Sequence, residues 1–378
     1  MTEVREVVII GAGLLGLSAA YALAARGRDA VVLEQAHIGH EGAGSKGNCR
    51  IFRLGYSDPG YVAAARRAGE LWRDLEASSG AAILWPTPQV TFGAGMRGVQ
   101  DAMLAAGARC EVLPAAEVAS RFPAVRTGGP ALLEPDSAVI AAEAALAALA
   151  AGVGEIRTGV RVVSIADDGR QVTVRTSQGP VTAQTVIVTA GPWSGGLLVT
   201  AGLSVPVRPT LEQVGYVKPA GGSAEALATP IFISHAEQAP YGLPVPFSPP
   251  LYKIGIHPSG PVTDPDAQQQ SDDPALLARL AEVAARYLPE YEPELVSGER
   301  CVYDNSPDED FVIDRIGNIV IGCGTSGHGF KFGPLLGEWL ASLATGTGDA
   351  PGPALRDRFA AGRFRPPTFA ASGPSGGT

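Results

Sequence analysis

The first 35 residues constrain the fold of this chain more than any other segment. Val7 to Ile10 is a short apolar run, as expected of a buried parallel strand, and residues 14–26 are rich in alanine and leucine, as expected of a helix. Residues 30–33 form a second apolar run, which Glu34 closes. Gly11 to Gly16 (GAGLLG) joins the first run to the helix with the spacing G-x-G-x-x-G. The segment therefore predicts a strand–helix–strand unit with a glycine-rich turn.

Each residue type in this turn has a physical reason to be there. Gly11 allows the tight turn, Gly13 lets the backbone approach a pyrophosphate, and Gly16 lets helix and strand pack closely. The helix N-terminus then offers free N–H groups and a positive dipole to phosphates. Glu34 follows Gly16 by 18 residues, where its carboxylate can bind an adenosine ribose. The order of these features predicts a dinucleotide site, and by itself it leaves FAD and NAD open.

Composition excludes several classes of protein. With 378 residues and 46% hydrophobic content, the chain can build two or more domains with a real core, so a disordered chain is not expected. A formal charge of −9 argues against nucleic acid as a partner. No apolar run is long enough to span a membrane, and MTEVRE lacks the basic start of a secretory signal. The four cysteines are scattered without a C-x-x-C pair, so we expect a cytoplasmic protein with no metal site.

The rest of the chain is predicted to alternate short strands with a few helices. We expect a long ligand-facing loop over residues 37–60 and short strands with turns over 83–135. Asp136 and Ser137 are placed to cap an alanine-rich helix over 139–151. Further expected elements are a helix over 61–78, strands at 161–163, 172–174, 186–188 and 319–322, a mobile loop over 219–228, helices over 274–287 and 333–344, and a disordered end.

Lysine is rare in this chain. Only four of the 29 basic residues are lysines, namely Lys46, Lys218, Lys253 and Lys331. Codon bias toward arginine accounts for most of this preference. Each remaining lysine still invites a functional explanation, because a lysine is a compact and movable charge that arginine cannot copy.

Four motifs together resemble the sarcosine oxidase and N-methyltryptophan oxidase branch of the D-amino-acid-oxidase-like flavoproteins, over residues 4–345. The first is the N-terminal unit. The second is Gly47 to Arg53 (GNCRIFR), similar to the G-x-(S/T)-R-x-x-R loop of that branch, although Cys49 departs from the usual serine or threonine. The third is KIGIH, beginning at Lys253. The fourth and most specific is CVYDNSPDEDFVID, beginning at Cys301, followed by SGHGFKF over 326–332.

The resemblance implies FAD as the cofactor, held covalently. Cys301 matches the cysteine that forms a thioether to the flavin 8α carbon, and a thiolate is the nucleophile for such a bond. Lys253 matches the lysine that lies near flavin N5 and promotes reaction with oxygen. The other cofactor-binding residues expected from the fingerprint and the resemblance are Gly11, Gly13, Leu14, Leu15, Gly16, Glu34, Gln35, Lys46, Cys49, Arg50, Val162, Gly191, Trp193, Gly327, His328, Gly329, Phe330 and Lys331.

The resemblance also implies the substrate side. Arg53 and Lys331 match the pair that clamps the substrate carboxylate, a group that the arginine fork can bind through both oxygens. His257 and Tyr241 match groups that face the substrate. His257 lies four residues after Lys253, which would place both on one face of a strand.

The fold that follows is α/β with two domains (α+β overall). A Rossmann-like FAD-binding domain would combine residues 1–82, 137–205 and 297–365. A discontinuous substrate domain built on a mixed β-sheet would combine residues 83–136 and 206–296, leaving 366–378 as a disordered tail.

The leading hypothesis is an FAD-dependent amine oxidase that converts a secondary, N-methyl or cyclic amino acid to an imine, with oxygen as the acceptor and hydrogen peroxide as a product. We expect it to act as a monomer, without nucleic acid or membrane partners. One alternative is a biosynthetic tailoring flavoprotein that oxidises a ring or carrier-bound amine. Two others are an NAD-dependent dehydrogenase and a non-catalytic flavin-binding module.

Overall fold

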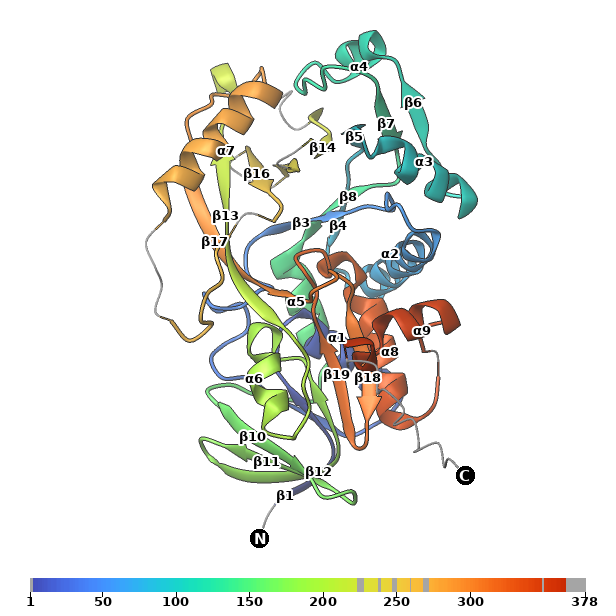
Figure 1. Ribbon diagram of the computed structural model, residues 1–378, viewed down its shortest axis with the longest axis vertical. Helices are drawn as coiled ribbons and strands as arrows, with labels where there is room; N and C mark the ends of the chain where they lie inside the picture. Colours follow the sequence, from blue (N-terminus) through green and yellow to red (C-terminus); the bar gives the residue numbers. More distant parts are fainter. Residues whose placement is uncertain are drawn as a thin grey trace, which may run out of the picture.

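The computed structural model describes residues 3–222, 228–236, 239–246, 250–258, 260–267, 272–348 and 350–364. Two large mixed sheets lie at opposite ends of the molecule, and a small third sheet lies between them (Figure 1). The predicted α/β class and the mixed substrate-side sheet are confirmed. The expected disordered tail lies outside the described residues, as does half of the expected loop over 219–228.

The first sheet grows from the N-terminal unit. Its strands are β1 (Glu3–Ile10), β2 (Ala30–Leu33), β9 (Glu155–Arg157), β10 (Val162–Asp167), β11 (Val172–Thr176), β12 (Gly179–Val188), β18 (Val312–Ile316) and β19 (Ile319–Cys323). Strands β19, β12, β1, β2 and β9 are neighbours and run parallel. Parallel strands need crossover connections, and α1 (Leu14–Ala25) supplies the one between β1 and β2. The predicted strand–glycine–helix–strand unit is therefore present.

The second sheet carries the other wall of the site. Its order is β17 (Ser297–Asn305), β13 (Arg208–Val217), β16 (Leu251–Ile256), β15 (Pro240–Val245), β14 (Ile231–His235), β5 (Gln89–Gly93), β7 (Ala131–Glu134) and β6 (Glu111–Leu113). All neighbours are antiparallel except β14 and β5. The sheet combines segments from three distant parts of the chain.

The third sheet corrects two sequence predictions. It pairs β8 (Ala138–Ala141) with β3 (Cys49–Phe52) on one side and β4 (Leu84–Pro86) on the other. The segment 37–60 is therefore not loop throughout, because residues 49–52 find a strand partner about 90 positions away. The alanine-rich helix begins only at α5 (Ala142–Ala151), its N-cap is Ala141, and Asp136 pairs with Arg109 instead of capping it.

Helices fill the space around and between the sheets. The expectation of strands and turns over 83–135 was incomplete, since α3 (Met96–Ala105) and α4 (Ala115–Arg121) occupy part of it. The helix predicted to start at Pro274 is confirmed as α7 (Pro274–Tyr287), with Asp273 as its N-cap. The remaining helices are α2 (Pro59–Ser79), α6 (Ser194–Val199), α8 (Gly333–Thr345) and α9 (Pro353–Phe359), with short 3-10 turns that include η1 (Gly191–Trp193) and η4 (Phe330–Phe332).

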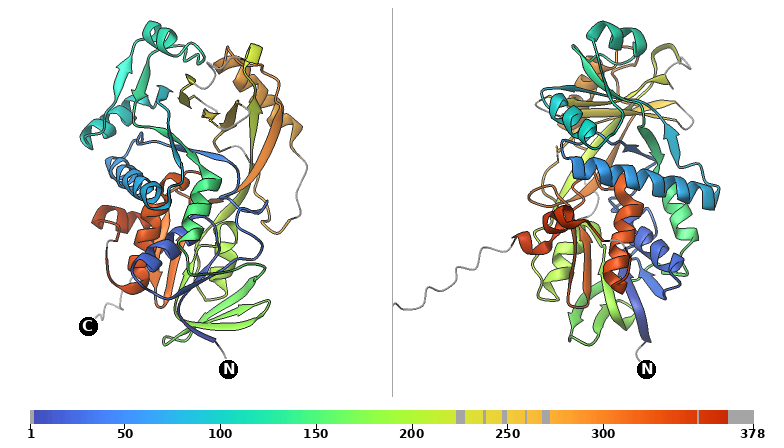
Figure 2. Two further views of the ribbon diagram at one scale, coloured as in Figure 1. Left: turned by 180° about the vertical axis from the view of Figure 1, so that it is seen from behind. Right: turned by 90° about the vertical axis from the view of Figure 1, so that its right-hand side faces the viewer.

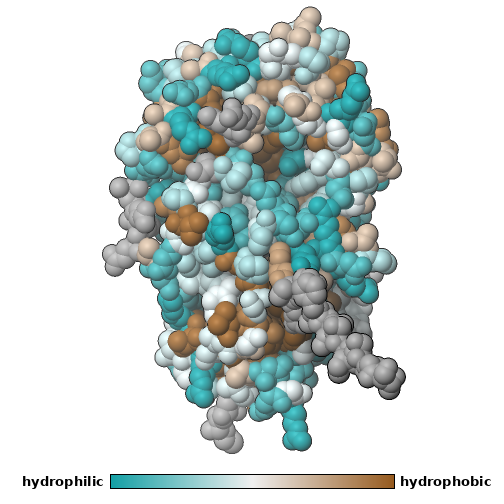
Figure 3. Space-filling view, in the orientation of Figure 1, coloured by the Kyte–Doolittle hydropathy of each residue, from teal (hydrophilic) through white to brown (hydrophobic). Residues whose placement is uncertain are grey.

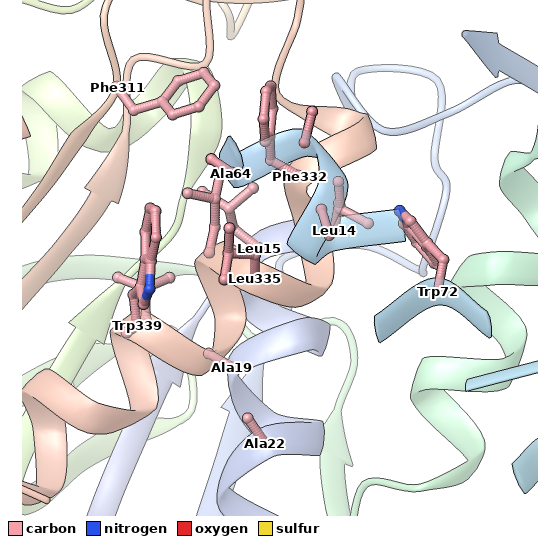
Figure 4. Packing of buried hydrophobic residues seen from close by; sticks show 14 of the residues in the cluster. Leu14, Leu15, Ala19, Ala22, Ala64, Trp72, Phe311, Phe332, Leu335 and Trp339 are labelled. Atoms are coloured by element: carbon pink, nitrogen blue, oxygen red, sulfur yellow. The ribbon is translucent and has the colours of Figure 1, made fainter. Parts of the chain in front are cut away.

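The helical core positions the glycine-rich turn. Helix α2 lies across the middle of the molecule between the two large sheets (Figure 2), and α1 packs directly against α8. Leu14, Leu335, Trp339, Trp72 and Phe332 belong to one buried cluster, in which Leu14 lies near Phe332 and Trp72 (Figure 4). Burying such large apolar side chains contributes about 1.5–3 kcal/mol each, so the start of α1 is held firmly.

Most of the face seen in Figure 3 is hydrophilic, with apolar residues in small patches. Among the residues that the structure describes, no helix combines the length and apolar character needed to cross a bilayer.

Candidate active site

One large cavity of about 1050 Å³ runs between the first and second sheets. It begins at the glycine-rich turn and extends to the strands of the second sheet. Of the residues that the sequence analysis proposed for the site, all except Gly16 and Lys46 line it. Residues more than 300 positions apart in the chain thus meet at one surface.

The glycine end of the cavity has the geometry of a dinucleotide cradle. Gly11 has a φ of +101°, and a Cβ there would lie 2.5 Å from the carbonyl oxygen of Thr189. A Cβ on Gly16 would lie 1.9 Å from the carbonyl oxygen of Gly11, so Gly16 serves packing instead of lining. The N-cap of α1, Gly13, provides no side-chain cap. The helix therefore directs its dipole toward this part of the cavity, where the N–H of Leu14 donates to the Ser45 hydroxyl, and this arrangement fits a pyrophosphate.

Glu34 is fixed at the end of β2. One carboxylate oxygen accepts a hydrogen bond from the N–H of Ala12 at 2.8 Å, and the other accepts from Ala36 at 3.0 Å. The side chain still lines the cavity. His40 Nε2 also lies 3.5 Å from the oxygen that accepts from Ala36. A carboxylate oxygen can accept more than one hydrogen bond, so the oxygen that accepts from Ala12 fits a ribose hydroxyl as well.

Arg161 and Asp266, to which no sequence motif pointed, line the cavity together with Trp193. Asp266 accepts a hydrogen bond from the indole N–H of Trp193 at 2.8 Å and pairs with Arg161 at 2.6 Å. Asp266 comes from the segment between β16 and α7, so the pairing depends on a long-range contact that no local motif announces.

Lys46 does not reach the main cavity. Its ammonium pairs with Glu41 and faces a second, smaller pocket of about 410 Å³. Its neighbour Ser45 does lie at the cradle, where its hydroxyl accepts a hydrogen bond from the N–H of Leu14 at 3.0 Å.

Cys301 lies in the cavity wall, on β17 opposite Glu212 of β13. Burial raises the pKa of its thiol, while the nearby cations Arg50 and Lys253 act in the opposite sense. Arg50 donates to the carbonyl oxygen of Cys49 at 2.9 Å and lies over the ring of Phe330. Burial also raises the pKa of the Cys49 thiol.

Lys253 is buried beside these residues on β16. Its Nζ lies 3.7 Å from the Glu299 carboxylate and 3.5 Å from the carbonyl oxygen of Cys49. Burial alone would raise the pKa of Glu299, but Lys253 and a hydrogen bond from the Tyr216 hydroxyl outweigh it and lower the pKa. The sequence analysis missed Glu299, although its position two residues before Cys301 on one strand signals that both face the same side.

Arg53 and Lys331 line the same cavity and are grouped around Tyr56. Lys331 donates to the Tyr56 hydroxyl at 3.0 Å and to the carbonyl oxygen of His328 at 2.8 Å. The Arg53 guanidinium lies 4.2 Å from the centre of the Tyr56 ring. Burial, with Arg53 nearby, lowers the pKa of Lys331 well below its usual value. Burial raises the pKa of Tyr56 to about 12. Tyr56 lies outside the sequence motifs that predicted the site, so no motif pointed to it.

Glu134 supports the loop that carries Arg53. This buried carboxylate, at the end of β7, accepts hydrogen bonds from the backbone N–H groups of Leu54 and Gly55. Burial raises its pKa, with the backbone N–H groups and Arg53 opposing that rise. Its role depends on the β5–β7 pairing, so sequence spacing alone gave no signal for it.

Tyr241 and His257 complete the wall. Tyr241 of β15 faces Gly255 of β16, and a Cβ on Gly255 would lie 2.5 Å from the Tyr241 ring, so the glycine makes room for the tyrosine. His257 directly follows β16, and its ring lies 5.8 Å from that of Tyr303. Burial lowers the pKa of His257. Both residues line the cavity together with Lys253.

Comparison with known proteins agrees with this geometry. The family model for FAD dependent oxidoreductases (DAO) matches residues 6–343. A peroxisomal sarcosine oxidase of Mus musculus is 32% identical over 363 residues, covering 91% of this chain and 93% of that protein. A monomeric sarcosine oxidase of Bacillus sp. (strain NS-129) is 32% identical, covering 90% and 92%. The structure of NikD, an unusual amino acid oxidase essential for nikkomycin biosynthesis, superposes with a TM-score of 0.83 at 25% identity and covers 95% of this chain and 98% of NikD.

The NAD-dependent dehydrogenase alternative is set aside by the family match, which spans both large sheets and the segments between them. This chain belongs to the DAO family of FAD-dependent oxidoreductases.

Proposed function

We propose that this protein oxidises the C–N bond of a small secondary, N-methyl or cyclic amino acid to an imine, with FAD as cofactor and oxygen as the final acceptor, so that hydrogen peroxide is produced. The observation that carries the proposal is that Arg53 and Lys331 are grouped around Tyr56 in the same cavity that contains the dinucleotide cradle. The names of the relatives, sarcosine oxidases and an amino acid oxidase, support the same substrate class.

The substrate end suits a carboxylate. An arginine fork can bind both oxygens of a carboxylate, and a lysine adds a third donor from a different direction. The guanidinium carbon of Arg53 lies 4.2 Å from the centre of the Tyr56 ring, and Nζ of Lys331 lies 5.6 Å from the same centre. A carboxylate in contact with both groups would compensate the charge of Arg53 and favour the charged form of Lys331.

The middle of the cavity suits the attachment of a flavin. We propose that Cys301 forms a thioether to the cofactor. Arg50 and Lys253 favour the thiolate that such a reaction needs, against the effect of burial. When bound, FAD would supply the two-electron acceptor for substrate oxidation and pass the electrons to oxygen.

Lys253 is proposed to promote the oxygen reaction. It is a buried cation on the cavity wall near Cys301 and Cys49, which places positive charge where reduction of oxygen develops negative charge. Glu299 and Tyr216 hold it there.

The wider organisation is proposed along the same lines. The FAD-binding domain would combine residues 1–82, 137–205 and 297–365, and the substrate domain residues 83–136 and 206–296, with the cavity between them. Strand β17, at the start of the last FAD-binding segment, pairs with β13 and so joins the sheet of the substrate side. We propose a monomer, as the name of the Bacillus relative suggests. All four cysteines are unpaired, which suits the reducing cytoplasm.

A second candidate keeps the chemistry and changes the substrate. NikD is described as essential for the biosynthesis of a natural product. This similarity supports a tailoring oxidase acting on a ring or carrier-bound amine, in which the cavity end near Tyr241 and His257 would receive a larger group.

The test is a substrate panel on the purified holoenzyme. Sarcosine, N-methyltryptophan, pipecolate and proline are mixed anaerobically with the protein while the flavin absorbance is followed, and peroxide is then assayed in air. The proposal expects bleaching and peroxide with at least one of these amines. Bleaching only by natural-product precursors would select the tailoring oxidase, and bleaching by neither group would overturn both.

A further inference from the structure

Lys331 differs from the other three lysines in its partners. Lys46 pairs with Glu41, Lys218 with Glu292, and Lys253 with Glu299. Within the described part of the chain, Lys331 pairs with no carboxylate, although only 5% of its surface is exposed. Both of its hydrogen bonds go to uncharged oxygens. A buried ammonium with neutral partners is costly, so this environment favours the free amine.

The hydrogen-bond chain around Lys331 has a defined direction. The carbonyl oxygen of Glu309 can only accept, so His328 Nε2, at 2.9 Å, must carry the hydrogen. Burial lowers the pKa of His328, so the ring is neutral and Nδ1 is left as an acceptor for the Tyr56 hydroxyl at 3.2 Å. The Tyr56 oxygen then accepts from Lys331. The chain fixes two N–H groups of Lys331 as donors to protein oxygens.

Nζ of Lys331 has three positions besides its bond to carbon, and two of them are the N–H groups that donate to Tyr56 and His328. The third position decides whether Lys331 can accept a proton. An ammonium has one more N–H there, and a free amine has a lone pair. Since Lys331 lines the cavity and its other two positions are occupied, this third position is the one available to a ligand.

In the absence of a substrate, the charged and titratable groups around Lys331 together favour its uncharged amine form. Arg53 and Tyr56 approach from the segment after β3, Glu134 from the end of β7, His257 from the end of β16, and His328 from the turn before η4. Burial and Arg53 lower the pKa of Lys331, and Glu134 opposes them only in part. A carboxylate bound between Arg53 and Lys331 would reverse this balance, because it adds a negative charge in contact with Nζ.

We propose that Lys331 is the proton acceptor for the substrate ammonium, and that the substrate's own carboxylate is what makes Lys331 basic enough to accept. This inference rests on the proposed function. One N–H bond of the substrate ammonium breaks and one N–H bond forms on Lys331 Nζ, so no electron is transferred and the total charge of the pair is unchanged. The product is a neutral amine, the form that can be oxidised, held by a carboxylate–ammonium contact. Because the amine and carboxylate are attached to the same carbon, a group that binds the carboxylate lies within reach of the amine directly or through one water.

The scarcity of lysine makes a direct test practical. The holoenzyme is labelled at the lysine ε position with ¹³C, and its four signals are titrated by NMR. Substitution Lys331→Arg assigns one signal by its loss, and Lys46→Arg, Lys218→Arg and Lys253→Arg assign the others. We expect the Lys331 midpoint to lie well below those of Lys46 and Lys218. A midpoint at or above theirs overturns the inference, whatever the enzyme's activity.

A second measurement reads the coupling to a carboxylate. Furan-2-carboxylate, which has a carboxylate and no amine, is titrated into the oxidised holoenzyme by calorimetry in buffers of different ionisation enthalpy. We expect uptake of close to one proton by the wild type and of none by the Lys331→Arg variant, whose guanidinium is always charged. Equal uptake by the two proteins would overturn the proposal.

The arginine variant also separates proton transfer from charge. It keeps a cation for the carboxylate but cannot accept a proton. Anaerobic flavin reduction by the variant should therefore rise about tenfold per pH unit between pH 7 and 9, as free amine becomes available, while the wild type changes far less. Parallel pH profiles would overturn Lys331 as acceptor. If no amine bleaches the flavin at all, the proposed function fails instead, and the NMR titration still decides the state of Lys331.

Discussion

Lys253, which is buried, and Glu299, which is partly exposed, form an ion pair in the wall of the main cavity, with 3.7 Å between Nζ and the nearest carboxylate oxygen. They come from β16 and β17, which are not neighbours, since both pair with the intervening β13. Tyr216 of β13 completes the contact by donating its hydroxyl hydrogen to Glu299. Glu299 also faces the smaller pocket that holds Lys46. The proposed oxygen-promoting cation is thus held by a carboxylate and a tyrosine.

Substitution Glu299→Gln should destabilise the protein, because Lys253 would keep a buried charge without a counter-ion. With partners 7% and 20% exposed, we expect a loss of about 1–3 kcal/mol near neutral pH. The pKa of Glu299 is lowered on folding, so its contribution is complete above the unfolded value of about 4.3 and disappears as pH falls through the lower folded value. Urea unfolding of both proteins across this range checks the sign.

The matched control is Glu41→Gln, which removes an exposed partner of Lys46 and should change stability by less than about 1 kcal/mol. A stability difference between wild type and Glu299→Gln that persists unchanged in acid would contradict the assignment of the effect to the Glu299 charge.

Substitution Lys253→Met should slow reoxidation of the reduced flavin by about 10²-fold or more while leaving flavin reduction nearly intact, because it removes positive charge needed only when oxygen is reduced. Stopped-flow measurement of the two half-reactions checks this, with Lys218→Met, whose ion pair lies outside the cavity, as the control. Equal losses in both half-reactions would remove the proposed role of Lys253.

Substitution Arg53→Met should raise the KM for amino acid substrates by about 10–100-fold, the equivalent of losing a charge-assisted hydrogen bond worth roughly 1.5–3 kcal/mol. Amines that lack a carboxylate should be affected much less, since nothing in them contacts the guanidinium. Steady-state kinetics on a substrate and its decarboxylated counterpart give the ratio. The same change in KM for both compounds would count against a carboxylate site at Arg53.

Substitution Asp304→Ala should loosen the turn that carries Gly327 to Phe330. Asp304 is buried and accepts hydrogen bonds from the N–H of Gly324 at 2.8 Å and from the Thr325 hydroxyl. Leaving these donors unpaired should cost about 2–3 kcal/mol and reduce the amount of FAD retained. Asp304→Asn keeps an acceptor oxygen and should lose less on both measures. If Asp304→Ala keeps the stability and the FAD content of the wild type, the turn is held by other contacts.

Local elements were predictable from the sequence because their signals are local. The strand–helix–strand unit and α7 carry their strands, glycines and caps within a few residues. Helix α3 was missed although Val99, Ala102 and Met103 have helical spacing, because its flanks suggested short strands. Helix α4 buries only Val118, and a single buried residue cannot show the spacing of apolar residues that indicates a helix. The pairing of β3 with β8 joins residues about 90 apart, which no window on the sequence can reveal.

The site residues also divide into those that a local motif predicted and those that depend on long-range contacts. The proposed cofactor and substrate residues came from motifs, and nearly all of them line one cavity. Tyr56, Glu134 and Glu299 were missed because each acts on a partner from another strand or turn. Their importance follows from burial and hydrogen bonds across elements, which depend on the complete fold.

The most direct test of the account is the mass of the intact purified protein, combined with peptide mapping and with Cys301→Ser as the control. We predict that the wild-type chain is heavier than its sequence by one FAD, that the added mass maps to the peptide containing Cys301, and that Cys301→Ser has the mass of the bare chain. A wild-type protein that stays at the mass of its bare chain after incubation with FAD would contradict the attachment on which the account depends.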